Sequence, residues 1–113
     1  MNDGERRALR YYRLRGYTLL EANARGGRYE LDLVLRRGRT VVFVEVKQRA
    51  GDAFGGPVGA VGPEKRRRVR HAATAWLVRH PELGDVEVAL EVAAVQGRRV
   101  ERYAFPLADE PAE

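Results

Sequence analysis

Hydrophobic and polar positions along the chain predict two helices. The first begins near Asp3, which can cap it, and runs to about Arg15, where Gly16 suits a helix C-terminus. The second runs from Pro63, a favourable first helical residue, to His80. Each has an apolar stripe at helical spacing. The first stripe contains Glu5, Ala8, Leu9 and Tyr12, and the second contains Val69, Ala72, Ala73, Trp76, Leu77 and His80.

Five further segments favour strands. The clearest case is Tyr29–Arg36, in which Tyr29, Leu31, Leu33 and Leu35 alternate with Glu30, Asp32 and Val34. Glycine-containing turns separate it from its neighbours, with 23–28 predicted as one turn and 37–39 as a hairpin turn. The predicted strands are 17–22, 29–36, 41–47, 86–96 and 98–105, the last two joined around Gly97.

The order of elements is therefore helix, three strands, helix and two strands, which favours an α/β fold. We expect one domain over residues 1–107 and a flexible acidic tail over 108–113. The segment Arg49–Pro63 has fifteen residues, with five glycines and two prolines. A connection of that length within a small domain is usually functional or mobile.

The strand 41–47 carries the most informative residues, because Glu45 and Lys47 interrupt a run of valines and lie on one face. Asp32, on the preceding strand, can join them. Carboxylates of this kind suit Mg²⁺ or Mn²⁺, which prefer oxygen ligands, and the backbone carbonyl of Val46 could be a third ligand. Lys47 would orient a water and stabilise negative charge, and Glu5 lies where it could reach the same cluster. This pattern indicates metal-dependent phosphodiester hydrolysis.

Each residue also has a purely structural interpretation. Glu45 and Lys47 could form an ion pair on a solvated sheet face, and Asp32 could be an ordinary surface acid. Glu5 could favour a helix N-terminus through the helix dipole. The hypothesis depends on the register of the hairpin. Asp32 must lie opposite Phe43 or Glu45, since a shift by one residue would turn Glu45 to the other face.

At these residues the sequence resembles the PD-(D/E)XK nuclease superfamily, whose pattern is an acid followed by acid-x-lysine on the next strand. It is similar above all to the YraN family of small bacterial proteins, through Gly4-Glu5, Tyr29–Val34, Phe43–Lys47, Phe54-Gly55 and Lys65–Ala73. The resemblance implies a restriction-endonuclease-like fold, with a central mixed sheet of about five strands flanked by helices, as in archaeal Holliday-junction resolvases. It departs from the family pattern at Tyr29, Gln48 and 89–91.

Charge agrees with a polyanionic partner. The net charge is +5, with nineteen arginines and two lysines, and arginine binds phosphate well. Coding bias or adaptation to heat could also raise arginine content. Five cations lie within 65–70, among which Lys65 is aligned with the buried stripe and is a candidate phosphate ligand. Arg66, Arg67 and Arg70, together with Phe54 and Gly55 of the long loop, are candidate nucleic-acid-binding residues.

Two functions follow as alternatives: a Mg²⁺- or Mn²⁺-dependent endonuclease acting on branched or single-stranded DNA, or a nucleic-acid-binding module without catalysis. We expect DNA rather than RNA as partner, a homodimer, and no membrane association. The chain has no cysteine, and no apolar run is longer than that of 41–44, which is too short to cross a bilayer. A cytoplasmic location is therefore expected.

Overall fold

The computed structural model describes residues 1–49 and 61–108 and confirms the predicted order of elements. Phe54, Gly55 and the tail 109–113 lie outside the described residues. The elements are α1 (Asp3–Arg13), β1 (Thr18–Gly26), β2 (Tyr29–Arg37), β3 (Thr40–Gln48), α2 (Pro63–Val78), the short 3₁₀ helix η2 (Pro81–Leu83), β4 (Glu87–Gln96) and β5 (Arg99–Phe105).

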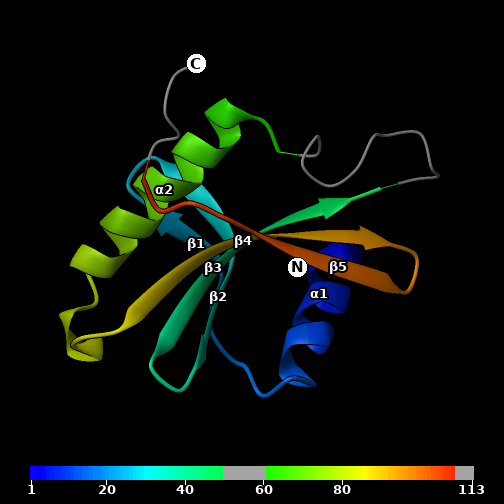
Figure 1. The fold of residues 1–113 in the computed structure, drawn as a ribbon, viewed down its shortest axis with the longest axis horizontal. Coiled ribbons are helices and arrows are strands. Elements are labelled where there is room, and N and C mark those ends of the chain that lie inside the picture. Colours follow the sequence, from blue (N-terminus) through cyan, green and yellow to red (C-terminus); the bar gives the residue numbers. More distant parts are fainter. Residues whose placement is uncertain (50–60, 109–113) are drawn as a thin grey trace.

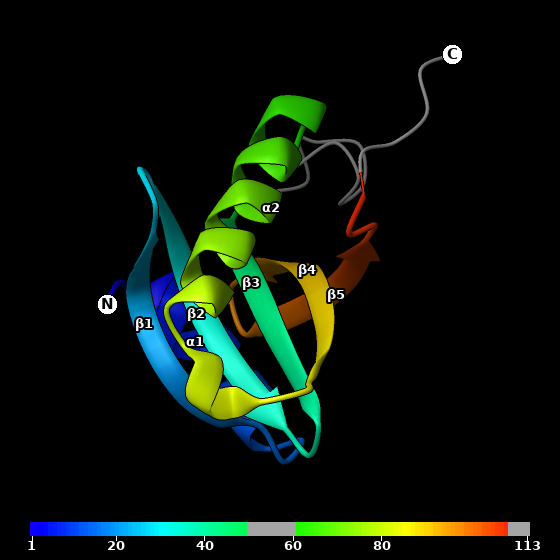
Figure 2. The same cartoon turned by 90° about the vertical axis from the view of Figure 1, so that its left-hand side faces the viewer.

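The strands form a single mixed sheet in the order β1-β2-β3-β4-β5. Strands β3 and β4 are parallel, because α2 connects them, and the other neighbours are antiparallel. The two helices lie on opposite faces of the sheet (Figure 1). In the view turned by 90°, α2 lies in front of the sheet and α1 lies behind it (Figure 2). This arrangement is compatible with a restriction-endonuclease-like fold.

Helix α1 begins with a reciprocal capping box, which fixes the position of Glu5. The Asn2 side chain accepts a hydrogen bond from the Glu5 N–H at 2.8 Å, and Glu5 Oε1 accepts one from the Asn2 N–H at 3.0 Å. The cap is therefore Asn2. The sequence had suggested Asp3, but only Asn2 lies three residues before Glu5. Gly16, with φ +89°, follows the helix in the left-handed conformation expected of it.

Each helix buries its apolar stripe against one face of the sheet. On the α1 side, Ala8, Leu9 and Tyr12 pack against Leu33, Leu35, Val42 and Val44. On the α2 side, Val69, Ala72, Ala73 and Trp76 pack against Val34, Val41, Phe43 and Leu90. Both predicted helical stripes are confirmed apart from His80, which lies outside α2 because that helix ends at Val78 and not at His80 as predicted.

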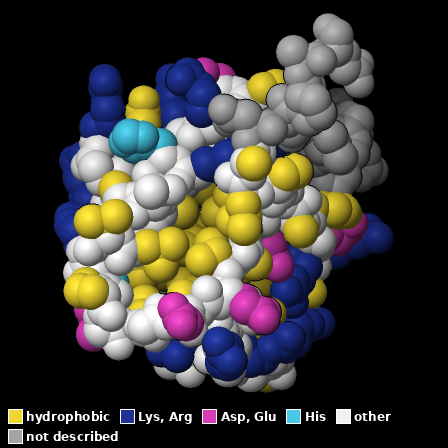
Figure 3. Space-filling view, turned by 60° about the vertical axis from the view of Figure 1, so that its left-hand side comes forward, with side chains coloured by type: hydrophobic (Ala, Val, Ile, Leu, Met, Phe, Trp, Pro, Cys, Tyr) yellow, Lys and Arg dark blue, Asp and Glu magenta, His cyan; other side chains and the backbone are white. Residues whose placement is uncertain are grey.

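Part of the α2 side is exposed. Hydrophobic side chains gather there in a hollow that charged side chains border (Figure 3). Several residues packed against the α2-side cluster are only partly buried: Leu77, Leu83, Val86, Val88 and Phe105.

Within residues 1–49 and 61–108, neither helix combines the length and the hydrophobicity that spanning a membrane would require.

Strands β1 and β2 change face together, which the sequence did not predict. Ala22 and its partner Leu33 pack on the α1 side, whereas Ala24 and its partner Leu31 pack on the α2 side. Between these pairs lies Asn23, whose φ of +50° reverses the alternation, and asparagine tolerates this conformation better than most residues.

Two predictions are corrected by this change of face. Tyr29 and Leu31 do not share a face with Leu33, because the switch lies between Leu31 and Leu33. The segment 23–28 is not all turn: β1 continues to Gly26, so only Gly27 and Arg28 connect the strands. In the sequence, Asn23 is a residue typical of turns. In the structure it is a single left-handed residue within a paired strand.

Candidate active site

The register of the β2–β3 hairpin brings Asp32 and Glu45 together. Its pairs run from Arg37 opposite Thr40 to Leu33 opposite Val44. Continued by one residue, this register sets Asp32 opposite Glu45, which is one of the two registers that the site requires. The predicted register of the hairpin is thus confirmed.

Asp32 lies where the paired ladder ends. Its Oδ2 accepts a hydrogen bond from the backbone N–H of Val46 at 2.8 Å, so the side chain occupies a position that a strand carbonyl would otherwise fill. Burial raises the pKa of Asp32 above its usual range; the Val46 N–H opposes this rise, and the nearby Glu5 carboxylate adds to it. Asp32 is therefore fixed in place but is costly to ionise.

Glu45 is almost completely buried, with 9% of the residue exposed. Burial and then the neighbouring Asp32 raise the pKa of Glu45 from 4.5 to about 7, although Lys65 opposes the rise. Lys65 Nζ lies 3.3 Å from Glu45 Oε1. The Lys65 ammonium, from the first turn of α2, is thus the cation that contacts this carboxylate pair.

Glu5 borders the same cluster from the α1 side. Its Oε2 accepts a hydrogen bond from Asn23 Nδ2 at 3.2 Å, and its other oxygen closes the capping box. Glu5 is buried, at 7% exposure. It therefore contributes negative charge near Asp32 while both of its oxygens have partners.

Lys47 is placed differently from the other motif residues. It lies on β3 but is exposed, and it does not line the cleft that contains Glu5, Asp32 and Glu45. Lys65, which comes from α2, does line that cleft. The structure therefore brings together Glu5, Asp32, Glu45 and Lys65 and leaves Lys47 outside this group.

The cleft has a volume of about 390 Å³ and a basic border. Arg25, Arg28 and Arg68 line it together with Lys65, and none of these arginines was singled out from the sequence. Arg68 could have been found, because it lies three residues after Lys65 on α2 and so on a neighbouring helical position. Arg25 and Arg28 lie at or beside the β1–β2 connection. Because the bounds of that connection were predicted wrongly, the position of these two arginines at the cleft could not be predicted.

The predicted arginines of α2 have partners within the protein. Arg66 Nη1 donates to the Val61 carbonyl at 2.9 Å, and Arg70 Nε donates to the Pro106 carbonyl at 2.8 Å. Arg67 pairs with Glu64 one turn earlier. None of these three arginines lines the cleft that contains Glu5, Asp32 and Glu45, which we call the acidic cleft.

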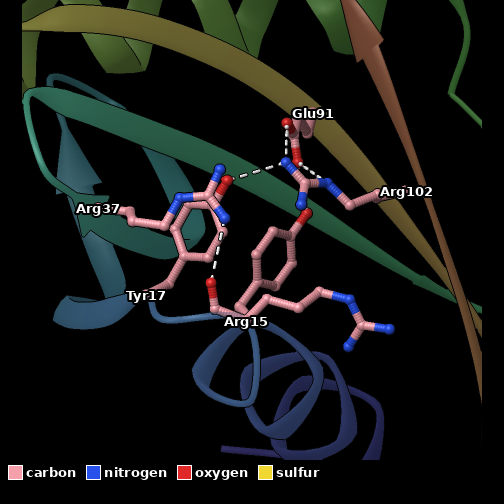
Figure 4. A network of polar contacts seen from close by, with 6 residues as sticks. Arg15, Tyr17, Arg37, Glu91 and Arg102 are labelled. Atoms are coloured by element: carbon pink, nitrogen blue, oxygen red, sulfur yellow. Dashed lines mark hydrogen bonds and ion pairs between the residues drawn. The ribbon is translucent and has the colours of Figure 1, made fainter.

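A second buried polar group lies on the α1 side, around Glu91. This carboxylate accepts hydrogen bonds from Arg102 Nε and Nη2, at 3.0 and 2.9 Å, and from the Tyr12 hydroxyl at 2.7 Å. Arg102 also donates to the Tyr17 hydroxyl at 3.0 Å (Figure 4). Burial, followed by the charge of Glu91, raises the pKa of Tyr12. Every member has a partner, so this is a structural network.

The carboxylates suit a hard divalent cation of the Mg²⁺ type. Glu45 is buried and the adjacent Asp32 is half-buried, and the pKa values of both are raised first by burial and then by neighbouring carboxylates. In residues 1–49 and 61–108, no group of three or more His, Cys, Asp or Glu side chains could hold a metal. Mg²⁺ keeps several waters and needs only one or two carboxylates, whereas structural zinc requires four protein ligands.

Comparison with known proteins agrees with the sequence motifs. A model of the "Uncharacterised protein family UPF0102" matches residues 4–102. A UPF0102 protein of Alkalilimnicola ehrlichii is 41% identical over 106 residues, covering 92% of this chain and 84% of the relative. One from Anaeromyxobacter dehalogenans is 44% identical over 93 residues, covering 82% and 69%. One from Serratia proteamaculans is 41% identical over 100 residues, covering 86% and 84%. The chain therefore belongs to the UPF0102 family, the YraN-like proteins.

Proposed function

We propose that the protein is a Mg²⁺- or Mn²⁺-dependent endonuclease that hydrolyses phosphodiester bonds in branched or single-stranded DNA. The observation that carries this proposal is the pair formed by the buried Glu45 and the half-buried Asp32, held at the end of the β2–β3 ladder and bordered by Lys65. Two adjacent carboxylates that are difficult to ionise together favour a divalent cation between them.

The proposed roles combine the contacts at the cleft with the acid-x-lysine pattern of the sequence. Asp32 and Glu45 would hold the cation, with the Val46 carbonyl as a further ligand. When bound, the cation would supply charge neutralisation at the phosphate and a more acidic water. Lys47, which does not line the cleft, would orient that water, a role that rests on the acid-x-lysine pattern. Lys65, Arg28 and Arg68 would bind the phosphates, since they border the cleft.

The carboxylates can be tested by cleavage assays on branched, single-stranded and duplex DNA with Mg²⁺ or Mn²⁺. Asp32→Asn and Glu45→Gln should lower cleavage by on the order of 100-fold or more. Glu87→Gln is the matched control, because Glu87 is an exposed acid on β4. If the control loses as much cleavage as the site variants, the carboxylate pair has no special role.

The two lysines can be separated in the same assays, run beside gel-shift measurements. Lys47→Ala should abolish cleavage and leave binding close to intact, because its ammonium acts on the water. Lys65→Ala should weaken binding as well, because its ammonium borders the cleft that receives phosphate. Equal binding losses in the two variants would refute this division of roles.

The alternative is a nucleic-acid-binding module without catalysis. Lys65 favours it, because an ammonium 3.3 Å from Glu45 already neutralises part of the charge that a metal would meet. This alternative holds if the wild type binds DNA but cuts none of the substrates, and if the Asp32 and Lys47 variants bind as the wild type does. A cytoplasmic homodimer acting on two strands fits either function.

A further inference from the structure

A basic groove, separate from the acidic cleft, lies between α1 and the β4–β5 hairpin. It has a volume of about 430 Å³, and four of the residues that line it are arginines: Arg7, Arg10, Arg15 and Arg98. Among the described residues, no aspartate or glutamate lines it. The groove therefore concentrates positive charge without a neutralising acid in its wall.

These arginines are held by neutral groups. Arg7 Nη1 donates to the Gly97 carbonyl, which ties α1 to the hairpin, and Arg15 Nη1 donates to the Tyr11 carbonyl at 3.0 Å. In the part of the chain that the structure describes, Arg10 and Arg98 have no ion pair with a carboxylate. All four charges are thus available to an anionic ligand.

The rest of the groove is apolar and aromatic, formed by Tyr11, Leu14 and Val100. The Arg15 guanidinium stacks on the Tyr11 ring, with Cζ 3.5 Å from the ring centroid. The Arg15 side chain points away from the Glu91 network, and its backbone carbonyl accepts a hydrogen bond from Arg37 Nη1 at 3.1 Å (Figure 4). A stacked guanidinium is a flat surface on which an unpaired base can lie.

We infer that this groove binds one single strand of nucleic acid, with its phosphates on the arginines and an unpaired base against the Arg15–Tyr11 stack. The inference rests on the nucleic-acid partner of the proposed function, but it assigns a separate binding surface. A concave groove with apolar walls and separated cations fits an alternation of bases and phosphates. A junction or flap, which presents both a duplex and a single strand, could occupy the cleft and the groove together.

The test compares two double variants with the same change in charge at neighbouring places, each with one substitution on α1 and one at the β4–β5 turn or the start of β5. Arg10→Ala/Arg98→Ala removes two groove cations. Arg13→Ala/Arg99→Ala is the control, because Arg13 is an exposed α1 residue that does not line this groove and Arg99 pairs with Glu101 at 3.3 Å. Circular dichroism verifies that both variants are folded. Fluorescence anisotropy, without divalent metal, measures binding to single-stranded DNA, duplex DNA and anionic phosphatidylglycerol vesicles.

The groove variant should bind single-stranded DNA at least about tenfold more weakly than the control. Its plot of log affinity against log salt should be shallower by about 1.4, since each phosphate contact on a single strand contributes about 0.7. Equal affinities and slopes in the two double variants would overturn the inference, as would binding of vesicles in place of DNA. Cleavage is measured separately: a groove effect without cleavage refutes only the nuclease, and cleavage without a groove effect refutes only the groove.

Discussion

Buried carboxylates with different partners explain most of the chemistry in this protein. Glu91 has an arginine and a tyrosine hydroxyl as donors, so its charge is compensated. Glu45 has as neighbours a second acid and a lysine that is itself half exposed, so its charge is only partly compensated. The first arrangement stabilises the fold, whereas the second retains unfavourable charge that a cation would relieve.

The pair should make stability depend on pH. The pKa of Glu45 is raised from 4.5 to about 7, so the folded state favours the protonated acid. This stabilisation is complete below pH 4.5 and is lost as pH rises through about 7. Without divalent metal, urea denaturation should show the free energy of unfolding falling by up to about 3 kcal/mol, at about 1.4 kcal/mol per pKa unit.

Glu45→Gln should flatten this dependence and make the protein more stable than the wild type above neutral pH. Adding Mg²⁺ at pH 8 or so should stabilise the wild type and leave Glu45→Gln unchanged. A wild-type stability that stays constant across this range, or the same fall in the variant, would show that Glu45 is not strained by its neighbours.

The Glu91 network should respond to mutation in the opposite way. Glu91→Gln should cost about 2–3 kcal/mol at neutral pH, because Arg102 loses its buried counter-charge. Glu101→Gln, which disrupts the exposed Arg99 pair on the next strand, should cost less than about 1 kcal/mol. Chemical denaturation distinguishes the two variants, and equal losses would contradict the assignment of Glu91 as a structural acid.

At the scale of residues, the sequence predicted what depends on local spacing. Asp32 and Glu45 were identifiable because strand alternation and a short hairpin fix their register. Lys65 was identifiable from its helical phase. Glu91 and Arg102 could not be paired in advance, since their contacts with Tyr12 and Tyr17 join residues far apart in the chain.

At the scale of elements, the important feature is the joint change of face in β1 and β2. Because of this change, Ala24 and Leu31, near the β1–β2 turn, pack under α2, whereas Ala22 and Leu33 pack on the α1 side. Gly26 lies at the closest approach, where an added Cβ would meet the Ala72 carbonyl oxygen at 2.0 Å. The helix backbone therefore rests directly on the strand at this point.

Gly26→Ala should consequently destabilise the protein by about 3 kcal/mol or more, because the obstacle is helix backbone and cannot move as a side chain would. The matched control is Gly62→Ala, at the start of α2, where an added Cβ has no neighbour within 4 Å among residues 1–49 and 61–108. The control should lose only about 1 kcal/mol or less, from a weaker helix cap. Thermal unfolding of both variants measures the difference; similar midpoints would refute the close contact.

Element type and order were predictable because the hydrophobic periods are clear, whereas the turn predicted at 23–28 was not correct. Asn23, Gly26 and Gly27 together are typical of a turn. In the structure they serve three purposes: a reversal of side-chain alternation, a close helix contact and the actual turn. Only tertiary packing distinguishes these purposes.

At the scale of the whole molecule, the parallel β3–β4 pair organises the site. The α2 crossover that this pairing requires carries Lys65 to Glu45, and the β4–β5 hairpin lies beside α1 to form the arginine groove. Basic surfaces thus occur at two places on one small sheet. Their separation suits a nucleic acid with more than one strand.

A nuclease that cuts paired strands should act as a twofold dimer. We therefore predict a homodimer, which light scattering at tens of micromolar, roughly the concentration at which an ordinary specific interface assembles, would detect. A mass corresponding to the 12.7 kDa chain at all such concentrations would contradict this prediction. It would not bear on the proposed metal site, since Glu5, Asp32, Glu45 and Lys65 all come from one chain.

The most direct test of the central claim is a crystal of the protein soaked in Mn²⁺ and measured at a wavelength where manganese scatters anomalously. The account predicts an anomalous peak between the carboxylates of Asp32 and Glu45, with Lys65 displaced from Glu45 by the metal. It also predicts that the peak is absent from Glu45→Gln crystals soaked identically. A wild-type crystal with no peak at this position, and with Lys65 still paired to Glu45, would contradict it.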